Sequence, residues 1–447
     1  MLAPDVRRMV TATISWIWAA GCNDAVSLEI ASDRPVPSAI DAICVGVADS
    51  SGHGGQFGHN YSVDSLPQTL RIEPGSASSA WAWVRGDRGG VPAATAAAHV
   101  SFGKDLRLAL DKCVAGRGSD PAVRGDPAGP AGARLAASQG SGGTFVVAVA
   151  AGSAAIIDAI DGGLVIGTAP APPAGTIIDV IALDVDGDCD DDLIVATSGA
   201  PPELWRRDGV DLVDAGPIGT VPVSALAAAD VDRDGDIDLV VASGGTLLLY
   251  RNDGGGTFAA DPAALDAGSR LTAASALALG DLDGDGNPDL VVGQAGGSLV
   301  AWLGSDGGGF QPSDAAVPAV PLNVSRLALV DADGDFDPDL VVAVSGAPMR
   351  LYVDRDGRLE DQSFVRLPQP APVANAIAIG GWDDGCEPDA VIAATAGAPT
   401  LRGQDGGVLA NDAMAPPGTD VVMADIDDDG VLDALIATDQ GVVWLAR

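Results

Sequence analysis

Residues 281–293, DLDGDGNPDLVVG, place three aspartates within five residues and then turn apolar. The same pattern returns as DVDGDCDDDLIVA from 184, DVDRDGDIDLVVA from 230, DADGDFDPDLVVA from 331 and DIDDDGVLDALIA from 425. A degenerate copy, GWDDGCEPDAVIA, starts at 381, and a copy without acids, ASQGSGGTFVVAV, starts at 137. The starts at 184, 230, 281, 331, 381 and 425 are 44 to 51 residues apart, so the chain contains an internal repeat.

The length of this repeat is typical of propeller blades of roughly 40 to 50 residues. Within the repeat that opens at Asp281, the segments SALALG, DLVVG, SLVAWLG and GFQPSD predict four short strands separated by turns. Helical periodicity is not sustained in the sequence. Seven copies, counting the degenerate ones, predict an all-β fold in which residues 134–447 form a seven-bladed β-propeller.

The last repeat ends at GVVWLAR, after its third predicted strand. A closed ring needs a fourth strand for this repeat. We expect that strand to come from the sequence ahead of the first repeat, within residues 105–130.

The acidic part of each repeat, D-x-D-x-D-G-x-x-D, offers carboxylates at positions 1, 3, 5 and 9 and a glycine at position 6. Carboxylate oxygens suit Ca²⁺, and glycine permits a sharp turn. An EF-hand shares the first half of this loop but needs a bidentate Glu at position 12. Position 12 is aliphatic and lies in a predicted strand in every intact copy, namely Val195, Val241, Val292, Val342 and Ile436. The loop is therefore predicted to be a calcium-binding turn between two strands rather than an EF-hand.

The period, the acidic loop and the D-L-V-V-A ending resemble the FG-GAP and VCBS repeats of integrin-alpha-like propellers over about residues 130–447. This resemblance implies one Ca²⁺ in each intact loop. The implied metal ligands are Asp184, Asp186, Asp188, Asp192, Asp230, Asp232, Asp234, Asp238, Asp281, Asp283, Asp285, Asp289, Asp331, Asp333, Asp335, Asp339, Asp425, Asp427, Asp429 and Asp433.

Three of the six copies that carry acids depart from the pattern. Cys189 and Phe336 replace the glycine at position 6, and the copy at 381 has Gly381 and Gly385 where acids are expected. We expect this last copy to hold no calcium. The alternative for all copies is that the acids form solvated turns without a metal, but four like charges in nine residues repel one another unless a cation neutralises them.

The overall charge limits the partners of the chain. Its 447 residues include 62 acidic and 24 basic side chains, which gives a formal net charge of -38. Such a chain repels nucleic acid and anionic lipid surfaces and attracts cations. Neither nucleic acid nor a bare membrane surface is therefore an expected partner.

Residues 1–22 have the pattern of an export signal. Arg7 and Arg8 precede the apolar run VTATISWIWAA, which is too short to span a membrane stably. The small residues directly before Cys22 resemble the bacterial lipoprotein processing site, which implies that Cys22 becomes the lipidated first residue. An exported protein anchored by lipid at the bacterial cell envelope is the expectation, and an ordinary cleaved signal is the alternative.

Residues 23–113 contain short alternating or apolar runs separated by Gly, Pro and Ser, which predict a small β-sandwich ahead of the propeller. Residues 114–133 are rich in Gly and Pro and are interpreted as a flexible linker. In an oxidising compartment Cys44 and Cys113 could form a disulfide, but their spacing leaves this open.

No catalytic constellation emerges from the sequence. The acids recur as predicted metal ligands, and the three histidines, His53, His59 and His99, all precede the predicted propeller. Neither a nucleophile elbow nor a P-loop or zinc signature is present. We therefore expect no enzyme, and a polysaccharide-degrading activity is a minority alternative.

The expected function is a calcium-stabilised, surface-anchored binding or scaffolding module whose partner is a protein or a glycan. A calcium-dependent carbohydrate-binding lectin is the alternative. Four aromatic residues in predicted third strands bear on it, because exposed rings could stack on sugars whereas buried rings would pack the blades. These residues are Trp205, Tyr250, Trp302 and Tyr352.

Overall fold

The structure is a computed structural model, and it divides the chain into two compact units, residues 1–112 and 113–447, which are considered separately. The described residues are 26–32, 42–48, 55–62, 68–72, 79–88, 91–101, 106–110, 122–138, 144–160, 163–188, 190–208, 211–265, 271–283, 285, 287–313, 315–330, 332, 338–355, 357–380, 389–404, 408–424, 426–427 and 432–446.

The described part of the first unit consists of two sheets. One has the order β4–β1–β7 and the other the order β3–β2–β5–β6. Their strands are β1 (Val26–Ser32), β2 (Ala42–Ala48), β3 (Gly55–Ser62), β4 (Gln68–Ile72), β5 (Ser79–Arg88), β6 (Val91–Ser101) and β7 (Leu106–Leu110). Packing of the two sheets into a sandwich stays a prediction. The signal segment 1–22 and Cys113 lie outside the described residues.

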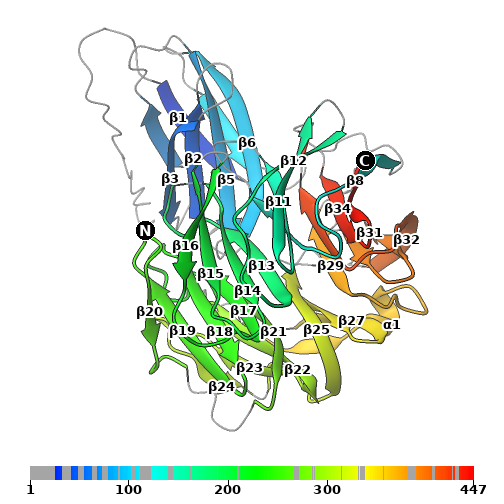
Figure 1. Cartoon of the computed structure of the whole chain (residues 1–447). Helices are drawn as coiled ribbons and strands as arrows, with labels where there is room; N and C mark the ends of the chain where they lie inside the picture. Colours follow the sequence, from blue (N-terminus) through cyan, green and yellow to red (C-terminus); the bar gives the residue numbers. More distant parts are fainter. Residues whose placement is uncertain are drawn as a thin grey trace, which may run out of the picture. The chain divides into compact units, whose positions relative to one another are not determined.

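The second unit is built from successive groups of four antiparallel strands (Figure 1). The fourth and fifth groups are joined into one eight-stranded sheet, because residues 295–298 pair with residues 321–323. The first group is β9 (Arg134–Ser138), β10 (Phe145–Ala150), β11 (Ser153–Ile160) and β12 (Gly163–Thr168), and the second is β13 (Ile177–Leu183), β14 (Asp192–Thr197), β15 (Glu203–Asp208) and β16 (Asp211–Pro217). The third is β17 (Ala225–Ala229), β18 (Asp238–Ser243), β19 (Thr246–Asn252) and β20 (Phe258–Asp261). The fourth is β21 (Ala274–Gly280), β22 (Asp289–Ser298), β23 (Val300–Leu303) and β24 (Gln311–Ser313).

Three further groups follow. They are β25 (Pro321–Val330), β26 (Asp339–Val344), β27 (Ala347–Asp354), β28 (Leu359–Asp361); β29 (Ala376–Gly380), β30 (Asp389–Ala393), β31 (Ala398–Gln404), β32 (Val408–Ala415); and β33 (Asp420–Ala424), β34 (Asp433–Thr438), β35 (Gly441–Ala446) with β8 (Ala122–Ala128). One helical turn, α1 (Ser363–Arg366), follows β28. Among the described residues, no helix has the length and apolar character needed to cross a membrane.

These groups are arranged as a ring. The first strand of each group contacts the first strand of the next, from β9 through β13, β17, β21, β25 and β29 to β33, and β33 in turn contacts β9. The second strands are short apolar runs buried on both faces, as in β14, β26 and β34. They are buried because each sheet is covered by a neighbour on either side. The all-β propeller predicted from the repeat is the observed fold class.

The ring closes through β8, which pairs antiparallel with β35, with Ala122 opposite Ala446 and Arg124 opposite Trp444. The Arg124 guanidinium also lies 5.2 Å from the centre of the Trp444 ring. The fourth strand of the last sheet therefore comes from within residues 105–130, as expected. This pairing corrects the interpretation of residues 114–133 as a flexible linker, because residues 122–128 form a strand. The physical reason is that β35 without a partner would leave the hydrogen-bonding groups of its edge exposed.

The third-strand aromatic residues pack between sheets. Trp205, Tyr250, Trp302 and Tyr352 are at most 4% exposed. Each lies in a core cluster with aliphatic residues from the second strand of the preceding sheet, for example Trp205 with Val147. These rings are therefore part of the core and are not available to stack on a sugar.

Candidate metal centres

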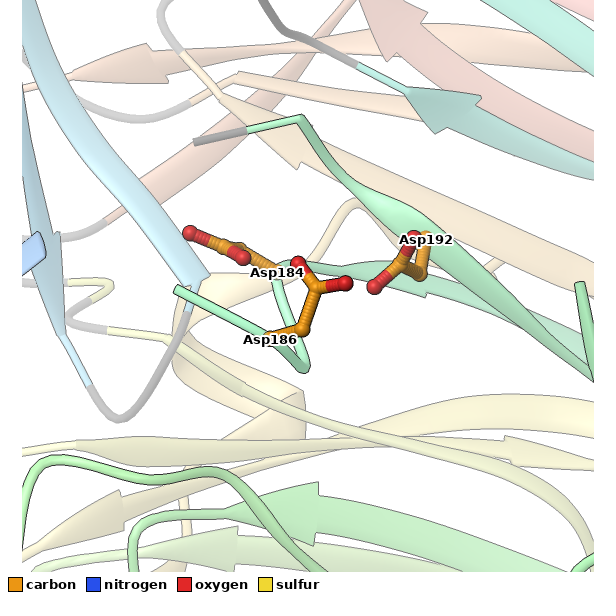
Figure 2. Close-up of side chains that lie close together, drawn as sticks. All are labelled: Asp184, Asp186 and Asp192. Atoms are coloured by element: carbon orange, nitrogen blue, oxygen red, sulfur yellow. The ribbon is translucent and has the colours of Figure 1, made fainter. Parts of the chain in front are cut away.

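In successive sheets, an acidic loop connects the first strand to the second strand of the same sheet. Figure 2 shows the first loop, where Asp192 at the start of β14 faces Asp186 and Asp184 lies beside them. In each of three loops, three carboxylates offer oxygens that all lie within 4.8 Å of one another. The three sets are Asp184, Asp186, Asp192; Asp230, Asp232, Asp234; and Asp281, Asp283, Asp285.

The grouping differs from one loop to another. The first cluster contains positions 1, 3 and 9, whereas the second and third contain positions 1, 3 and 5. Position 5 also shapes the turn, because Asp188 Oδ1 accepts the N–H of Asp190 at 2.9 Å, and Asp234 and Asp285 make the same contact two residues on. The predicted ligands that lie outside the described residues are Asp331, Asp333, Asp335, Asp425 and Asp429, as do Cys189, Phe336 and residues 381–388 of the degenerate copy.

The turn is made by two left-handed positions. Gly235 at position 6 has φ of 98°, in agreement with the reason for a glycine there. Position 4 is also left-handed, with φ of 76° at Gly187 and 63° at Arg233. The sequence analysis overlooked position 4, although the glycines at 187, 284 and 334 signal it.

Position 9 has a structural role that the sequence analysis missed. Asp289 is fully buried, and it accepts the N–H of Leu282 at 2.7 Å and of Gly304 at 2.6 Å. The carboxylate thus joins the start of the acidic loop to the end of the third strand. In four other groups of strands a backbone N–H near the end of the third strand likewise donates to Oδ1 of the position-9 aspartate, at 2.7 to 2.9 Å. These aspartates are Asp192, Asp238, Asp339 and Asp389.

Position 3 combines an ion pair with a buried oxygen that has no donor. Oδ2 of Asp186, Asp232 and Asp427 lies 3.2, 2.8 and 3.2 Å from an Nη1 atom, that of Arg206, Arg251 and Arg124 respectively. Oδ1 of each of these aspartates is buried and accepts no hydrogen bond from any described residue.

A buried carboxylate oxygen without a donor is costly unless a cation binds it. Ca²⁺ takes 6–8 oxygen ligands from carboxylates, carbonyls and water. Clustered carboxylates with an uncommitted inner oxygen therefore fit calcium, which would neutralise their charge and hold the loop in one conformation.

The electrostatics of the clusters agree with this fit. Burial, reinforced by repulsion from neighbouring aspartates, raises the pKa of Asp192 to about 8 and the pKa of Asp188 and Asp230 to about 7. Burial likewise raises the pKa of Asp289 to about 7. Ionised carboxylates are thus unfavourable here without a compensating positive charge.

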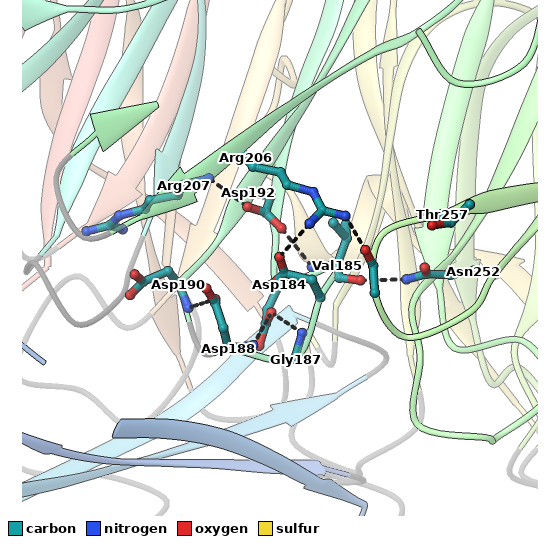
Figure 3. A network of polar contacts seen from close by, with 12 residues as sticks. Asp184, Val185, Gly187, Asp188, Asp190, Asp192, Arg206, Arg207, Asn252 and Thr257 are labelled. Atoms are coloured by element: carbon teal, nitrogen blue, oxygen red, sulfur yellow. Dashed lines mark hydrogen bonds and ion pairs between the residues drawn. The ribbon is translucent and has the colours of Figure 1, made fainter. Parts of the chain in front are cut away.

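Polar contacts link the loop opening at Asp184 to the following sheet. Figure 3 shows Arg206 between the loop around Asp184 and the segment that carries Asn252. Arg206 donates to the Gly255 carbonyl, and Asn252 Nδ2 donates to the carbonyl of Val185 at 2.7 Å. The loops therefore lie at junctions between neighbouring sheets.

A pocket of about 380 Å³ lies beside this junction. Leu204, Arg206 and Ile218 line one side of it, and Thr257 and Phe258 of the next sheet line the other. The lining of the pocket combines apolar side chains with a guanidinium and a hydroxyl group.

This fold, together with its acidic loops, defines the class: the second unit is a β-propeller with an acidic repeat. Residues 184–241, 230–292 and 281–342 each match the family model of FG-GAP-like repeats. A search of curated protein sequences found no match.

The chain is similar to several solved structures, of which the first named here supports the fold. A lectin from Burkholderia pseudomallei is 18% identical, with a TM-score of 0.50 over 70% of this chain and 96% of the lectin. A lectin of Agrocybe aegerita that recognises non-reducing terminal N-acetylglucosamine is 15% identical over 71% of this chain and 86% of its own, with a TM-score of 0.47. A rhamnogalacturonan lyase from Bacillus licheniformis is 14% identical over 94% and 74%, with a TM-score of 0.36. At these identities the likeness concerns the fold alone.

Proposed function

We propose that the chain is a calcium-stabilised, non-enzymatic binding or scaffolding module. The observation that carries the calcium assignment is the buried, uncommitted Oδ1 of the position-3 aspartate in three separate loops. Calcium would act as a structural ligand. Extracellular modules bind it with dissociation constants of about 0.1 to 1 mM, so millimolar external calcium would keep such loops largely occupied.

Calorimetric titration of the metal-free protein with CaCl₂, followed by thermal unfolding with and without chelator, tests this role. We expect several bound ions and a higher melting temperature in calcium, because a ligand that binds only the folded state stabilises it. Absence of heat and of any shift in melting temperature would show that the acids are solvated turns.

We also propose export and lipid anchoring through Cys22, on the evidence of Arg7, Arg8 and the apolar run before Cys22. The experiment is metabolic labelling with a fatty acid in a bacterial host, comparing the native chain with Cys22→Ser. Label in the native chain alone supports the anchor. Secretion of both chains without label would indicate an ordinary cleaved signal.

A calcium-dependent lectin is the second candidate, and the pocket beside Arg206 and Phe258 is the observation that favours it. A glycan array probed once in calcium and once in chelator separates the candidates. Calcium-dependent hits without turnover of the sugar favour a lectin. Silence in both conditions favours a protein partner, and degradation of a bound polysaccharide would overturn the non-enzymatic assignment.

A further inference from the structure

Two arginines occupy the same place in neighbouring sheets. Arg206 follows Trp205, which lies opposite Leu193, and Arg251 follows Tyr250, which lies opposite Leu239. The equivalent residue in the next sheet is Leu303, which follows Trp302. The three loops with described clusters thus provide two cases with an arginine and one without.

Each arginine holds its own acidic loop. Arg206 Nη1 lies 3.2 Å from Asp186, and Arg251 Nη1 lies 2.8 Å from Asp232 and 3.2 Å from Asp238. The Arg251 side chain is only 19% exposed. A guanidinium in this position neutralises part of the loop charge that a metal would otherwise neutralise.

Each arginine also reaches the following sheet. Arg206 donates to the Gly255 carbonyl, and Arg251 Nη2 donates to the carbonyls of Gly307 and Gly308 at 3.1 and 2.9 Å. Gly256 and Gly308 have φ of 71° and 72°, and a Cβ at either position would collide with the guanidinium. The turns DGGGTF and DGGGF therefore leave room for the guanidinium of an arginine from the preceding sheet and accept its hydrogen bonds.

The third junction is built differently. Asp283, at position 3, has no arginine against it among the described residues, and Gly357 from the following sheet packs on it directly. A Cβ at Gly357 would lie 3.3 Å from Asp283 Cβ, which is a tight contact. Nothing cationic from the third strand neutralises this carboxylate, because the equivalent residue is Leu303.

We propose that Arg206 and Arg251 are built-in counter-ions that hold the first two junctions without metal and make the loops opening at Asp184 and Asp230 weaker calcium sites than the loop opening at Asp281. This inference rests on the proposed calcium binding. A fixed positive charge a few ångströms from a cation site lowers its affinity, since ligand charge is one of the properties that tune calcium dissociation constants. The same charge stabilises the loop while calcium is absent.

The test is calorimetric titration of the metal-free protein with CaCl₂, comparing the native chain with Arg206→Met, Arg251→Met and Leu303→Arg. We expect each arginine removal to tighten one of the weaker sites roughly tenfold. The same removals should lower the melting temperature in chelator. Leu303→Arg should weaken the tightest site. The matched control is Arg350→Met, because Arg350 pairs with Asp361 at 3.6 Å and both side chains are more than 40% exposed.

The outcomes separate this inference from the calcium proposal. A native chain that binds no calcium refutes the proposed function itself. Calcium binding that is equal in all variants refutes only the counter-ion role. Weaker binding after arginine removal would show that the arginines orient the carboxylates instead. If a methionine variant fails to fold, Arg206→Gln and Leu303→Arg still give the comparison, because the latter adds a charge without removing an arginine.

Discussion

Arg326 and Asp179 are in contact although 147 residues separate them, with Nη2 of the arginine 3.4 Å from the carboxylate. Arg326 belongs to β25 and Asp179 to β13, the first strands of two sheets that are not neighbours in the ring. Arg326 Nη2 also donates to the carbonyl of Ile178 at 3.0 Å. The inner strands on opposite sides of the ring are thus joined across its centre.

Arg326→Ala is expected to destabilise the protein by about 1–3 kcal/mol, because the charged hydrogen bond to Ile178 is lost and the carbonyl is left without that donor. Urea unfolding provides the measurement. Arg350→Ala is the control, with an expected effect below about 0.5 kcal/mol since its ion pair with Asp361 is exposed. Equal effects of the two substitutions would show that the contact across the ring adds no stability.

Asp389 and Asp283 are expected to respond differently to calcium. Asp389 sits in the degenerate copy and accepts the Gly403 N–H at 2.7 Å, so Asp389→Ala should cost about 1–3 kcal/mol in calcium and in chelator alike. Asp283→Asn should destabilise only in calcium. In chelator it relieves the burial of a charged carboxylate and its repulsion from Asp285, and the amide oxygen can still accept the Asp285 N–H. Thermal unfolding in both buffers checks this. A calcium-dependent effect at Asp389 would contradict the expectation that the degenerate copy holds no calcium.

The metal-free protein is expected to gain stability as the pH falls. Burial raises the pKa of Asp238, Asp289 and Asp192 to about 6, 7 and 8, above the value of about 3.9 for an unfolded aspartate. Because the folded-state pKa values are raised, these aspartates contribute most to the free energy of unfolding below about pH 4. This contribution is lost as the pH rises through 6 to 8.

Melting temperatures in chelator, measured from about pH 5 to about pH 8, should therefore decrease with pH. Calcium should flatten or reverse this trend, because it binds the ionised carboxylates. Asp289→Asn serves as the control, since it removes one of the titrating groups and should reduce the slope. A melting temperature in chelator that rises over this pH range would refute the prediction.

Arg233→Gly is expected to stabilise the protein by about 1 kcal/mol, because a non-glycine residue at φ of 63° is strained and glycine is not. The reverse comparison is Gly187→Ala at the equivalent position, where φ is 76°, with an expected loss of similar size. Both values come from urea unfolding in calcium. If Arg233→Gly were less stable than the native chain, the contacts of the arginine side chain would contribute more to stability than its left-handed backbone conformation costs.

Deletion of residues 122–128, which leaves β7 of the first unit intact, is expected to lower the melting temperature by more than about 5 °C, because β35 loses its partner β8 and Trp444 becomes exposed. Scanning calorimetry of the deleted and native chains checks this expectation. An unchanged transition would show that the ring does not depend on this strand.

Much of the fold follows from local pattern. The repeated loop, the apolar second strands and the aromatic residue of the third strand lie within one repeat, so their spacing is visible in the sequence. The need for a fourth strand before the first repeat followed from counting strands. The turn glycine at position 6 was equally accessible, whereas position 4 was overlooked because an arginine occupies it in one copy.

The role of each acid was less accessible. From sequence spacing alone, positions 1, 3, 5 and 9 look like equivalent ligands. In the structure, however, the position-9 residues Asp289 and Asp339 each accept two backbone N–H groups, one from the start of the acidic loop and one from the end of the third strand. The position-3 aspartates Asp186 and Asp232 instead pair one oxygen with an arginine and keep the other uncommitted. These differences depend on the third strand, which lies well beyond the motif.

By itself, therefore, the sequence determined the all-β repeat and the carboxylate-rich turn, because both depend on residues within a few positions of one another. Only the tertiary structure decided which charges meet. Arg206 and Gly255 are 49 residues apart, Arg326 and Ile178 are 148 apart, and Arg124 and Asp427 are 303 apart. Such pairs form because a closed ring of sheets brings neighbouring turns, inner strands and chain ends together, and no local spacing encodes that closure.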